Sequence, residues 1–282
     1  MKPARPANLV ALLSDFGLSD GYVGSMKAAV LAANPRARLV DITHAIPPGD
    51  VLEAAFLLRC VFQDYPPGTV FLAVVDPGVG SARRPLALKA GGWFFVGPDN
   101  GLFCLAFEQA ISKAATRQRF RVVELQSKLY FRKNISATFH GRDIFGPCAG
   151  ALSRGVALEK LGQPIHDYAG LNYSGPRPGK RAIFGRIMRV DSFGNLVSDI
   201  NREDAALFFV AAFVGAAPAL RVQVGRWRMA IAPHYAGQPT NRPFAVWGSS
   251  GFLEISANRA SAADLLRLRK GAQVRLFSPP GT

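Results

Sequence analysis

The sequence is poor in cysteine and histidine, with three cysteines and four histidines among its 282 residues. Cys60, Cys104 and Cys148 lie far apart and form no CxxC pair, so we expect neither a disulfide framework nor a cysteine-ligated metal. We expect them to be buried free thiols. The histidines lack HxH or HExxH spacing, and we therefore expect no bound metal.

The sequence also lacks a long hydrophobic run. No stretch reaches the roughly 18 uninterrupted apolar residues that a membrane-spanning helix needs. The nearest, residues 205–220, is broken by Gly215 and Pro218, and we interpret it as a pair of buried strands. Residues 1–8 are rich in proline and are followed by no apolar signal-peptide core, so we expect a cytoplasmic protein without a membrane partner.

Acidic residues are scarce, with 19 Asp and Glu against 34 Lys and Arg, which gives a net charge of +15. Such a charge raises the question of nucleic-acid binding. The basic residues are dispersed, however, and none belongs to a stacking-aromatic motif of the kind found in RNA-binding sheets. We therefore expect a solvated basic surface and no nucleic-acid partner.

The first part of the chain alternates short apolar runs with amphipathic stretches, a pattern typical of a parallel sheet with crossover helices. Strands are predicted at 9–14, 38–43 and 69–75. Helical spacing of apolar residues predicts a helix up to 33, and Asp50 with Glu53 forms a capping box for a second helix. We predict an α/β N-terminal domain with a mostly parallel sheet over residues 1–170.

The second part of the chain is predicted to be all-β. Residues 171–182, rich in Gly and Pro and without periodicity, are interpreted as a linker. Closely spaced strands are then predicted at 183–190, 207–214, 220–224, 228–231, 244–247, 252–255 and 273–277, with one helix at 262–269. We expect residues 183–282 to form a smaller, barrel-like C-terminal domain.

Acidic side chains follow the predicted strands of the first domain. Asp15 ends the first strand, Asp41 and His44 the second, and Asp76 the third. Because the carboxyl ends of parallel strands share one edge of a sheet, where ligands bind, these residues predict a site there. An Asp that only caps a turn is the alternative for each residue taken alone.

Asp76, Arg83 and His140 are the candidates for catalysis. They can place a proton acceptor, an orienting carboxylate and a fixed positive charge around one water molecule. Asp76 begins the segment DPGVGSARR, whose glycines suit either a tight turn or close approach to a ligand. No lysine follows as in a P-loop, and GxGxxG is absent, so phosphate binding is disfavoured.

Seven segments in order resemble the S-adenosyl-L-methionine hydroxide adenosyltransferases, relatives of the enzymes that fluorinate and chlorinate the same substrate. They are SDFGLSDGYVG, VDITHAIPPGDVLEAA, VVDPGVGSARR, GPDNGLF, TFHGRDIF, DSFGN and SSGFLEISAN. The resemblance implies an α/β domain, a β-barrel domain, and a homotrimer with sites between the N-domain of one subunit and the C-domain of the next. It also implies hydrolysis of S-adenosyl-L-methionine to adenosine and methionine, with no cofactor.

The same resemblance assigns roles to residues of this chain. It implies that Asp76, Arg83 and His140 are catalytic and that Asp15 binds the ribose. Asp191, Asn195, Ser249 and Glu254 match positions that hold methionine or adenine, whereas the role of Asn258 is less closely defined. The expected substrate-binding set is Asp15, Asp20, Asn100, Phe139, Gly141, Asp191, Asn195, Ser249, Glu254 and Asn258.

Two other functions remain open at this point: a chlorinase-type halogenase, and a protein that binds S-adenosyl-L-methionine or adenosine without turnover. Fluorinating relatives carry an aromatic residue in place of Asp76 and a fluoride-binding serine in place of Gly141. Chlorinating relatives also have glycine there, so Gly141 alone excludes only a fluorinase. The complete set of Asp76, Arg83 and His140 favours water as the nucleophile.

Overall fold

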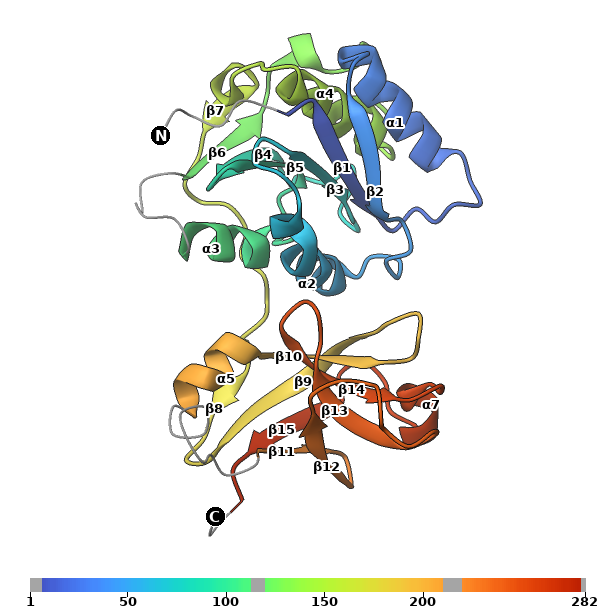
Figure 1. Cartoon of the computed structure of the whole chain (residues 1–282). Helices are drawn as coiled ribbons and strands as arrows, with labels where there is room; N and C mark the ends of the chain where they lie inside the picture. Colours follow the sequence, from blue (N-terminus) through green and yellow to red (C-terminus); the bar gives the residue numbers. More distant parts are fainter. Residues whose placement is uncertain (1–6, 113–119, 210–219, 280–282) are drawn as a thin grey trace. The chain divides into compact units, whose positions relative to one another are not determined.

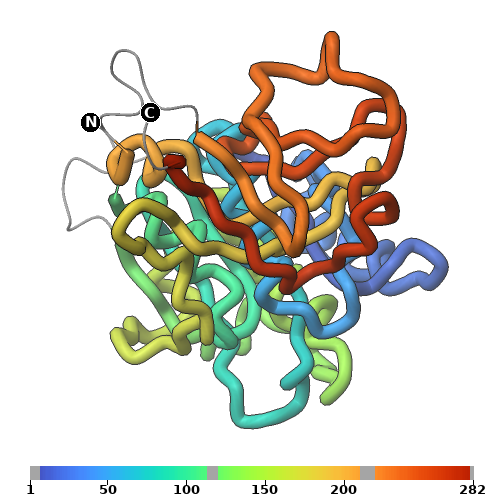
Figure 2. The backbone as a smooth tube through the Cα atoms, turned by 90° about the horizontal axis from the view of Figure 1, so that it is seen from below, coloured from blue at the N-terminus to red at the C-terminus, as the bar shows by residue number. Residues whose placement is uncertain are grey.

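The computed structural model describes residues 7–112, 120–209 and 220–279. The chain divides into two compact units, Met1–Asn172 and Tyr173–Thr282. The first unit is a sheet covered by helices, and the second is mostly β-structure (Figure 1). Figure 2 follows the backbone from the blue-to-green first unit to the yellow-to-red second.

The first unit contains a seven-stranded sheet in the order β2-β1-β3-β5-β4-β6-β7. Strands β2, β1, β3 and β5 run parallel, and the pairings of β4, β6 and β7 are antiparallel. Its elements are β1 (Leu9–Ser14), α1 (Tyr22–Ala33), β2 (Arg38–Thr43), α2 (Val51–Val61), η1 (Phe62–Asp64), β3 (Val70–Val74), β4 (Pro85–Ala90), β5 (Trp93–Pro98), α3 (Cys104–Ser112), β6 (Phe120–Leu125), η2 (Lys128–Tyr130), η3 (Gly141–Phe145), α4 (Gly146–Ser153), η4 (Leu158–Lys160) and β7 (Gly162–Pro164).

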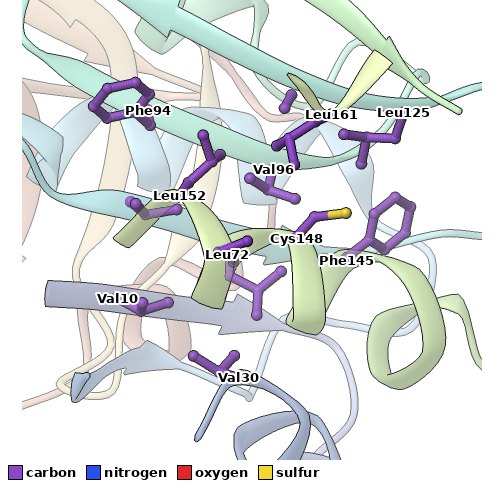
Figure 3. Close-up of a cluster of buried hydrophobic side chains, with 14 of the residues drawn as sticks. Val10, Val30, Leu72, Phe94, Val96, Leu125, Phe145, Cys148, Leu152 and Leu161 are labelled. Carbon is purple, nitrogen blue, oxygen red and sulfur yellow. The ribbon is translucent and has the colours of Figure 1, made fainter. Parts of the chain in front are cut away.

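Helices cover both faces of this sheet. Successive residues of a strand point to opposite faces, so each strand contributes side chains to two cores. In β1, Val10 and Leu12 belong to the core beneath α1 and α4, which Figure 3 shows in close-up. Ala11 and Leu13 belong to the other core, beneath α2 and α3. All four side chains are fully buried. The only polar residue of β1 is Ser14, its last residue.

The second unit is a barrel that closes where β10 pairs with both β14 and β9. The closed order is β10-β14-β13-β12-β11-β15-β9, with β8 added outside β9, so the prediction of a barrel-like domain is confirmed. Its elements are β8 (Arg177–Pro178), β9 (Ala182–Val190), β10 (Leu196–Asn201), α5 (Arg202–Phe208), β11 (Arg221–Val224), β12 (Trp227–Ala232), β13 (Pro243–Trp247), β14 (Phe252–Ala257), α7 (Ala262–Leu266) and β15 (Gln273–Phe277).

One strand predicted in this unit is wrong in the part of it that the structure describes. The strand expected at 207–214 begins inside helix α5, and residues 210–214 lie outside the described residues. Asn201 caps this helix, because its side-chain oxygen accepts a hydrogen bond of 2.6 Å from the amide of Glu203. Acidic residues in the first turn favour the helix further. β10, just before it, was not predicted.

The three cysteines are free thiols. Cys148, on α4, is buried in the core between this helix and the sheet, and burial raises the pKa of its thiol to about 12. Cys60 and Cys104 are only partly buried, so the expectation of buried thiols holds fully for Cys148 alone. Within the described ranges, none of the helices has the length and hydrophobicity required to cross a membrane.

Helices α1 and α4 touch through small residues, and this contact yields a stability prediction. A Cβ added at Gly150 would lie 2.5 Å from the carbonyl oxygen of Val30 and 2.8 Å from Cβ of Ala33. Gly150→Ala should therefore destabilise the protein by about 1–3 kcal/mol through overpacking. Gly24→Ala, in exposed space on α1, should be neutral or stabilise by up to about 1 kcal/mol. Urea denaturation followed by circular dichroism measures both, and equal effects would contradict the assigned packing.

Candidate active site

The carboxyl ends of the parallel strands gather polar side chains at one edge of the first unit's sheet. Neighbouring strands β1, β3 and β5 run parallel. Asp15 follows β1, Asp76 follows β3, and Asn100 follows β5. In open α/β sheets this edge is where ligands bind, so the topology places these residues where a site is expected.

Arg83 contacts both other members of the predicted catalytic set. Its Nε donates to Oδ1 of Asp76 at 3.0 Å, and its Nη2 donates to Oδ2 of the same carboxylate. Nη2 also donates to Nδ1 of His140 at 2.7 Å. The structure therefore brings Asp76, Arg83 and His140 into one hydrogen-bonded cluster, although His140 lies 57 residues beyond Arg83 in the sequence.

A tight turn returns Arg83 to the carboxylate of Asp76. The amide of Val79 donates to the carbonyl of Asp76, and the hydroxyl of Ser81 donates to the carbonyl of Gly78. Gly80 has a φ of 79°, and a Cβ there would lie 2.5 Å from the carbonyl oxygen of Ala137. The glycines thus serve the turn and its contact with the segment before His140.

His140 stands at the start of a π-helical turn, η3, which continues into α4. Single π-helical turns are frequent at functional sites. The ring of Phe145 in this turn lies edge-on to His140, with centroids 6.4 Å apart, and the Arg83 guanidinium lies 5.1 Å from the same ring. Phe145 is fully buried, so the cluster rests against the hydrophobic core.

The electrostatics of the cluster keep His140 neutral. Burial, followed by the positive charge of Arg83, lowers the pKa of His140 below its ordinary value of 6.5, against a smaller opposing effect of Asp76. A guanidinium has only donors, so Nη2 of Arg83 can only donate to Nδ1 of His140. The ring proton of neutral His140 is consequently on Nε2.

One nitrogen of Arg83, the buried Nη1, is left without a hydrogen-bond partner among the described residues. A buried polar atom left unsatisfied is unfavourable and calls for an explanation. The unused N–H groups of Nη1 and the N–H of His140 Nε2 are donors, and each kind of group can donate to an oxygen atom such as that of water.

Three predicted substrate-binding residues of this unit form hydrogen bonds with other residues of the same unit. Asp15 Oδ2 accepts a hydrogen bond of 2.8 Å from the amide of Gly49. Asn100 donates to the carbonyl of Val75, next to Asp76, at 2.9 Å, which holds the end of β3 in place. Asp20 is exposed in the turn before α1, where its carboxylate accepts a hydrogen bond from Ser19.

Sequence reasoning missed two aromatic residues beside His140. The rings of Phe16, Tyr22 and Phe139 pack together with centroids 5.4 to 6.1 Å apart. A Cβ added at Gly141 would lie 3.3 Å from the ring of Phe16, so a glycine here leaves room for that ring. Phe16 and Tyr22 stand in the first motif, SDFGLSDGY, and their aromatic character was the signal that could have identified them.

In the second unit, Asp191, Asn195 and Glu254 gather at one end of the barrel. Asp191 Oδ2 accepts from Nδ2 of Asn195 at 2.8 Å, within the turn between β9 and β10. Glu254, on β14, is partly buried, and burial followed by the charge of Asp191 raises its pKa to about 6. Ser249 lies in the adjoining turn, where the Glu254 carboxylate lies against Gly248.

Asn258, by contrast, is bonded to a different loop. Its Nδ2 donates to the carbonyl of Gln238 at 2.7 Å, and its own carbonyl accepts from the amide of Asn241. These bonds tie the end of β14 to the loop before β13. Its contacts in the described chain are therefore those of a residue that shapes a loop.

Known proteins resemble this chain along nearly its whole length. The family model for the SAM hydroxide adenosyltransferase N-terminal domain matches residues 10–162, and the model for the C-terminal domain matches residues 185–275. The (R)-S-adenosyl-L-methionine hydrolase of Thermus thermophilus is 38% identical over 270 residues, which are 95% of this chain and 99% of that protein.

Two further relatives extend the comparison. The fluorinase of an Actinoplanes species is 25% identical over 304 residues, covering 96% of this chain and 98% of the fluorinase. The crystal structure of an uncharacterized conserved protein from Thermotoga maritima aligns with a TM-score of 0.85 at 33% identity, covering 95% of this chain and 99% of that chain. With both family models matched in order, the chain belongs to the SAM hydroxide adenosyltransferase family.

Proposed function

We propose that this protein hydrolyses S-adenosyl-L-methionine to adenosine and L-methionine. The observation that carries the proposal is the contact of Arg83 with both Asp76 and His140, which leaves unused donors suited to a water molecule. The activity named for the Thermus relative and the family of the chain support it.

The leaving group of this reaction needs no assistance from the protein. A sulfonium bonded to C5′ of the ribose loses its charge when the C5′–S bond breaks, so no general acid is needed. A water oxygen forms the new bond to C5′, methionine departs with the bonding electron pair, and one proton of the water is released. The task of the site is therefore to hold the water in line and to take its proton.

We assign separate roles to the three residues of the cluster. Arg83, through Nη1, and His140, through its Nε2 proton, donate to the water oxygen and stabilise the negative charge that develops on it. Neutral His140 offers Nδ1 as its acceptor, and that atom already accepts from Arg83. The proton therefore goes to the carboxylate of Asp76, which has lone pairs beyond those bonded to Arg83.

The remaining expectations extend this proposal to substrate binding and assembly. Asp15 would bind the ribose hydroxyls, and the cluster of Asp191, Asn195 and Glu254 would hold the adenine or methionine part. The expected homotrimer, with sites formed by the α/β unit of one subunit and the barrel of the next, rests on the family resemblance. The cytoplasmic location stays a prediction from the sequence.

Isotope labelling tests the reaction directly. Purified protein should convert S-adenosyl-L-methionine to adenosine in buffer made with ¹⁸O water, with the label at the 5′ oxygen, because water is the nucleophile. Chromatography with mass spectrometry measures this. Recovery of 5′-chloro-5′-deoxyadenosine as the main product in chloride buffer would identify a halogenase, and binding without any product would identify a non-catalytic protein.

Variants should separate residues that act on the water from those that hold the substrate. His140→Ala should lower kcat by about 10²–10⁴-fold, as expected for a residue that serves the transition state. Asp15→Ala should mainly raise the Kd for S-adenosyl-L-methionine, since a ribose acceptor acts before the chemical step as well. His166→Ala is the matched control, because this exposed histidine of the same unit should leave kcat unchanged. An unchanged kcat in His140→Ala would exclude this histidine from the mechanism.

The pH dependence should report the lowered pKa of His140. Protonation would place an N–H at Nδ1 against the Arg83 guanidinium and break their hydrogen bond. Because the folded-state pKa lies below 6.5, kcat/KM should stay level as the pH falls through 6.5 and decline only at lower pH. His140→Asn, which keeps an acceptor for Arg83 and does not titrate, should lack that decline. An apparent pKa at or above 6.5 would argue against the assignment.

A further inference from the structure

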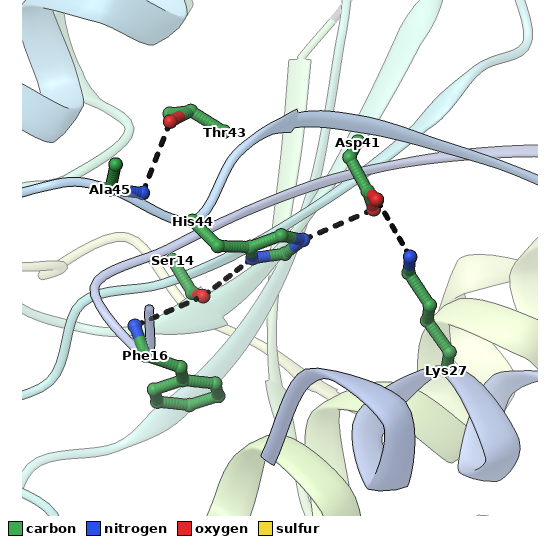
Figure 4. A network of polar contacts seen from close by, with 7 residues as sticks. All are labelled: Ser14, Phe16, Lys27, Asp41, Thr43, His44 and Ala45. Atoms are coloured by element: carbon green, nitrogen blue, oxygen red, sulfur yellow. Dashed lines mark hydrogen bonds and ion pairs between the residues drawn. The ribbon is translucent and has the colours of Figure 1, made fainter. Parts of the chain in front are cut away.

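A second series of hydrogen-bonded polar side chains lies beside the proposed site and has no part in the proposed reaction. The hydroxyl of Ser14, at the end of β1, lies 2.7 Å from Nδ1 of His44. Nε2 of His44 lies 3.1 Å from Oδ1 of Asp41, and Nζ of Lys27, on α1, donates to Oδ2 of Asp41 at 2.6 Å. Figure 4 shows these four residues in line, from the end of β1 across β2 to α1.

The order of serine, histidine and aspartate is that of a hydrolase triad, but burial excludes a nucleophile. Ser14 is 0% exposed and His44 is 3% exposed, so the hydroxyl cannot reach a substrate. The Ser14 oxygen also accepts from the amide of Phe16 at 3.3 Å. The hydroxyl can then donate to Nδ1 of His44, and Nε2 of His44 can donate to Asp41. The Ser14 hydroxyl and both ring nitrogens of His44 have hydrogen-bond partners in this arrangement, as their burial demands.

This chain of hydrogen bonds fixes the loop that carries Asp15. The amide of Phe16 is bonded to Ser14, and the amide of Gly17 donates to the carbonyl of His44 at 2.8 Å. The carboxylate of Asp15 itself accepts from Gly49. The backbone is therefore held to the segment after β2 on both sides of Asp15. The ring of Phe16 extends from this loop to Phe139, the residue before His140.

A bulge in β2 brings the members of the chain together. The pairing of β1 with β2 changes register from Leu12↔Asp41 to Leu13↔Thr43, so Ile42 is an extra residue. Bulges re-aim side chains and occur often beside active sites. Here Asp41, just before the extra residue, reaches both Lys27 and His44, and His44 in turn contacts Ser14 at the end of β1.

We propose that Ser14, His44, Asp41 and Lys27 form a positioning relay that holds Asp15 and Phe16 in the orientation required for substrate binding. Ser14 and His44 are too deeply buried to touch a substrate, and the relay acts through the backbone of residues 15–17. The proposal rests on the proposed function only where Asp15 is taken to bind the ribose. The effect of the relay on the backbone of residues 15–17 can be measured without any substrate.

Matched variants test the relay in kinetic assays of the full-length protein. His44→Phe replaces the imidazole with a larger apolar ring and removes both side-chain hydrogen bonds, and we expect it to raise the KM for S-adenosyl-L-methionine about 10–100-fold with a much smaller change in kcat. Ser14→Ala should do the same. The double variant should be no worse than either single one, since both break one chain. His44→Asn, whose side-chain oxygen can accept from Ser14, should restore part of the lost affinity.

A second buried serine of the same unit supplies the control. Ser153 is 1% exposed, accepts from Asn34 at 2.9 Å and donates to the carbonyl of Gly150 at 2.8 Å. Ser153→Ala should lower stability as Ser14→Ala does but leave KM unchanged. A KM raised equally by both substitutions would reduce the relay to general structural support and overturn the proposal.

Hydrogen exchange separates failure of the relay from failure of the proposed function. In His44→Phe and Ser14→Ala, the amides of Phe16 and Gly17 should exchange faster while those of β3 remain protected. This result is expected even if the wild-type protein does not hydrolyse S-adenosyl-L-methionine, in which case the proposed function fails alone. Unchanged exchange at Phe16 and Gly17 in folded variants would overturn the relay.

Discussion

The charge-assisted contact of Arg83 with Asp76 determines the arrangement of the site. A guanidinium that meets a carboxylate with two donors has little freedom of orientation, and both side chains are largely buried. The remaining N–H groups of Arg83 are therefore directed by this pair: the second N–H of Nη2 donates to His140, and those of Nη1 have no partner in the described chain. The state of His140 follows from the same contact, because its Nδ1 must accept from a cation.

Much of the fold could be predicted from the sequence, because local patterns determine it. β1 and β2 begin and end at the predicted residues, and the apolar run of β1 stops before Asp15. Helix α2 begins after Asp50, whose side chain accepts from the amide of Glu53 as a capping box requires. The placement of Asp15 and Asp76 at one edge follows from parallel strands and needs no knowledge of side-chain contacts.

The contacts within the site could not be predicted, because they depend on segments distant in sequence. Arg83 reaches His140 only because Gly80 lets its turn pack against Ala137. The relay from Ser14 depends on the bulge at Ile42, and no local pattern indicates that bulge. In the second unit, the capping by Asn201 outweighed the apolar run that follows, and the predicted strand proved to begin in a helix.

The charge balance of the cluster suits a positively charged substrate. The sulfonium of the proposed substrate would be repelled by an isolated arginine, but Asp76 neutralises Arg83. The protonation state of His140 then decides the net charge of the cluster. A protonated His140 would make the cluster positively charged, whereas a neutral His140 leaves it with the balanced charges of Arg83 and Asp76. Burial and Arg83 together lower the pKa of His140. In the proposed mechanism, the cation that would orient the water thus also keeps its neighbour uncharged, so the cluster would bind the developing hydroxide without repelling the sulfonium next to the C5′ atom under attack.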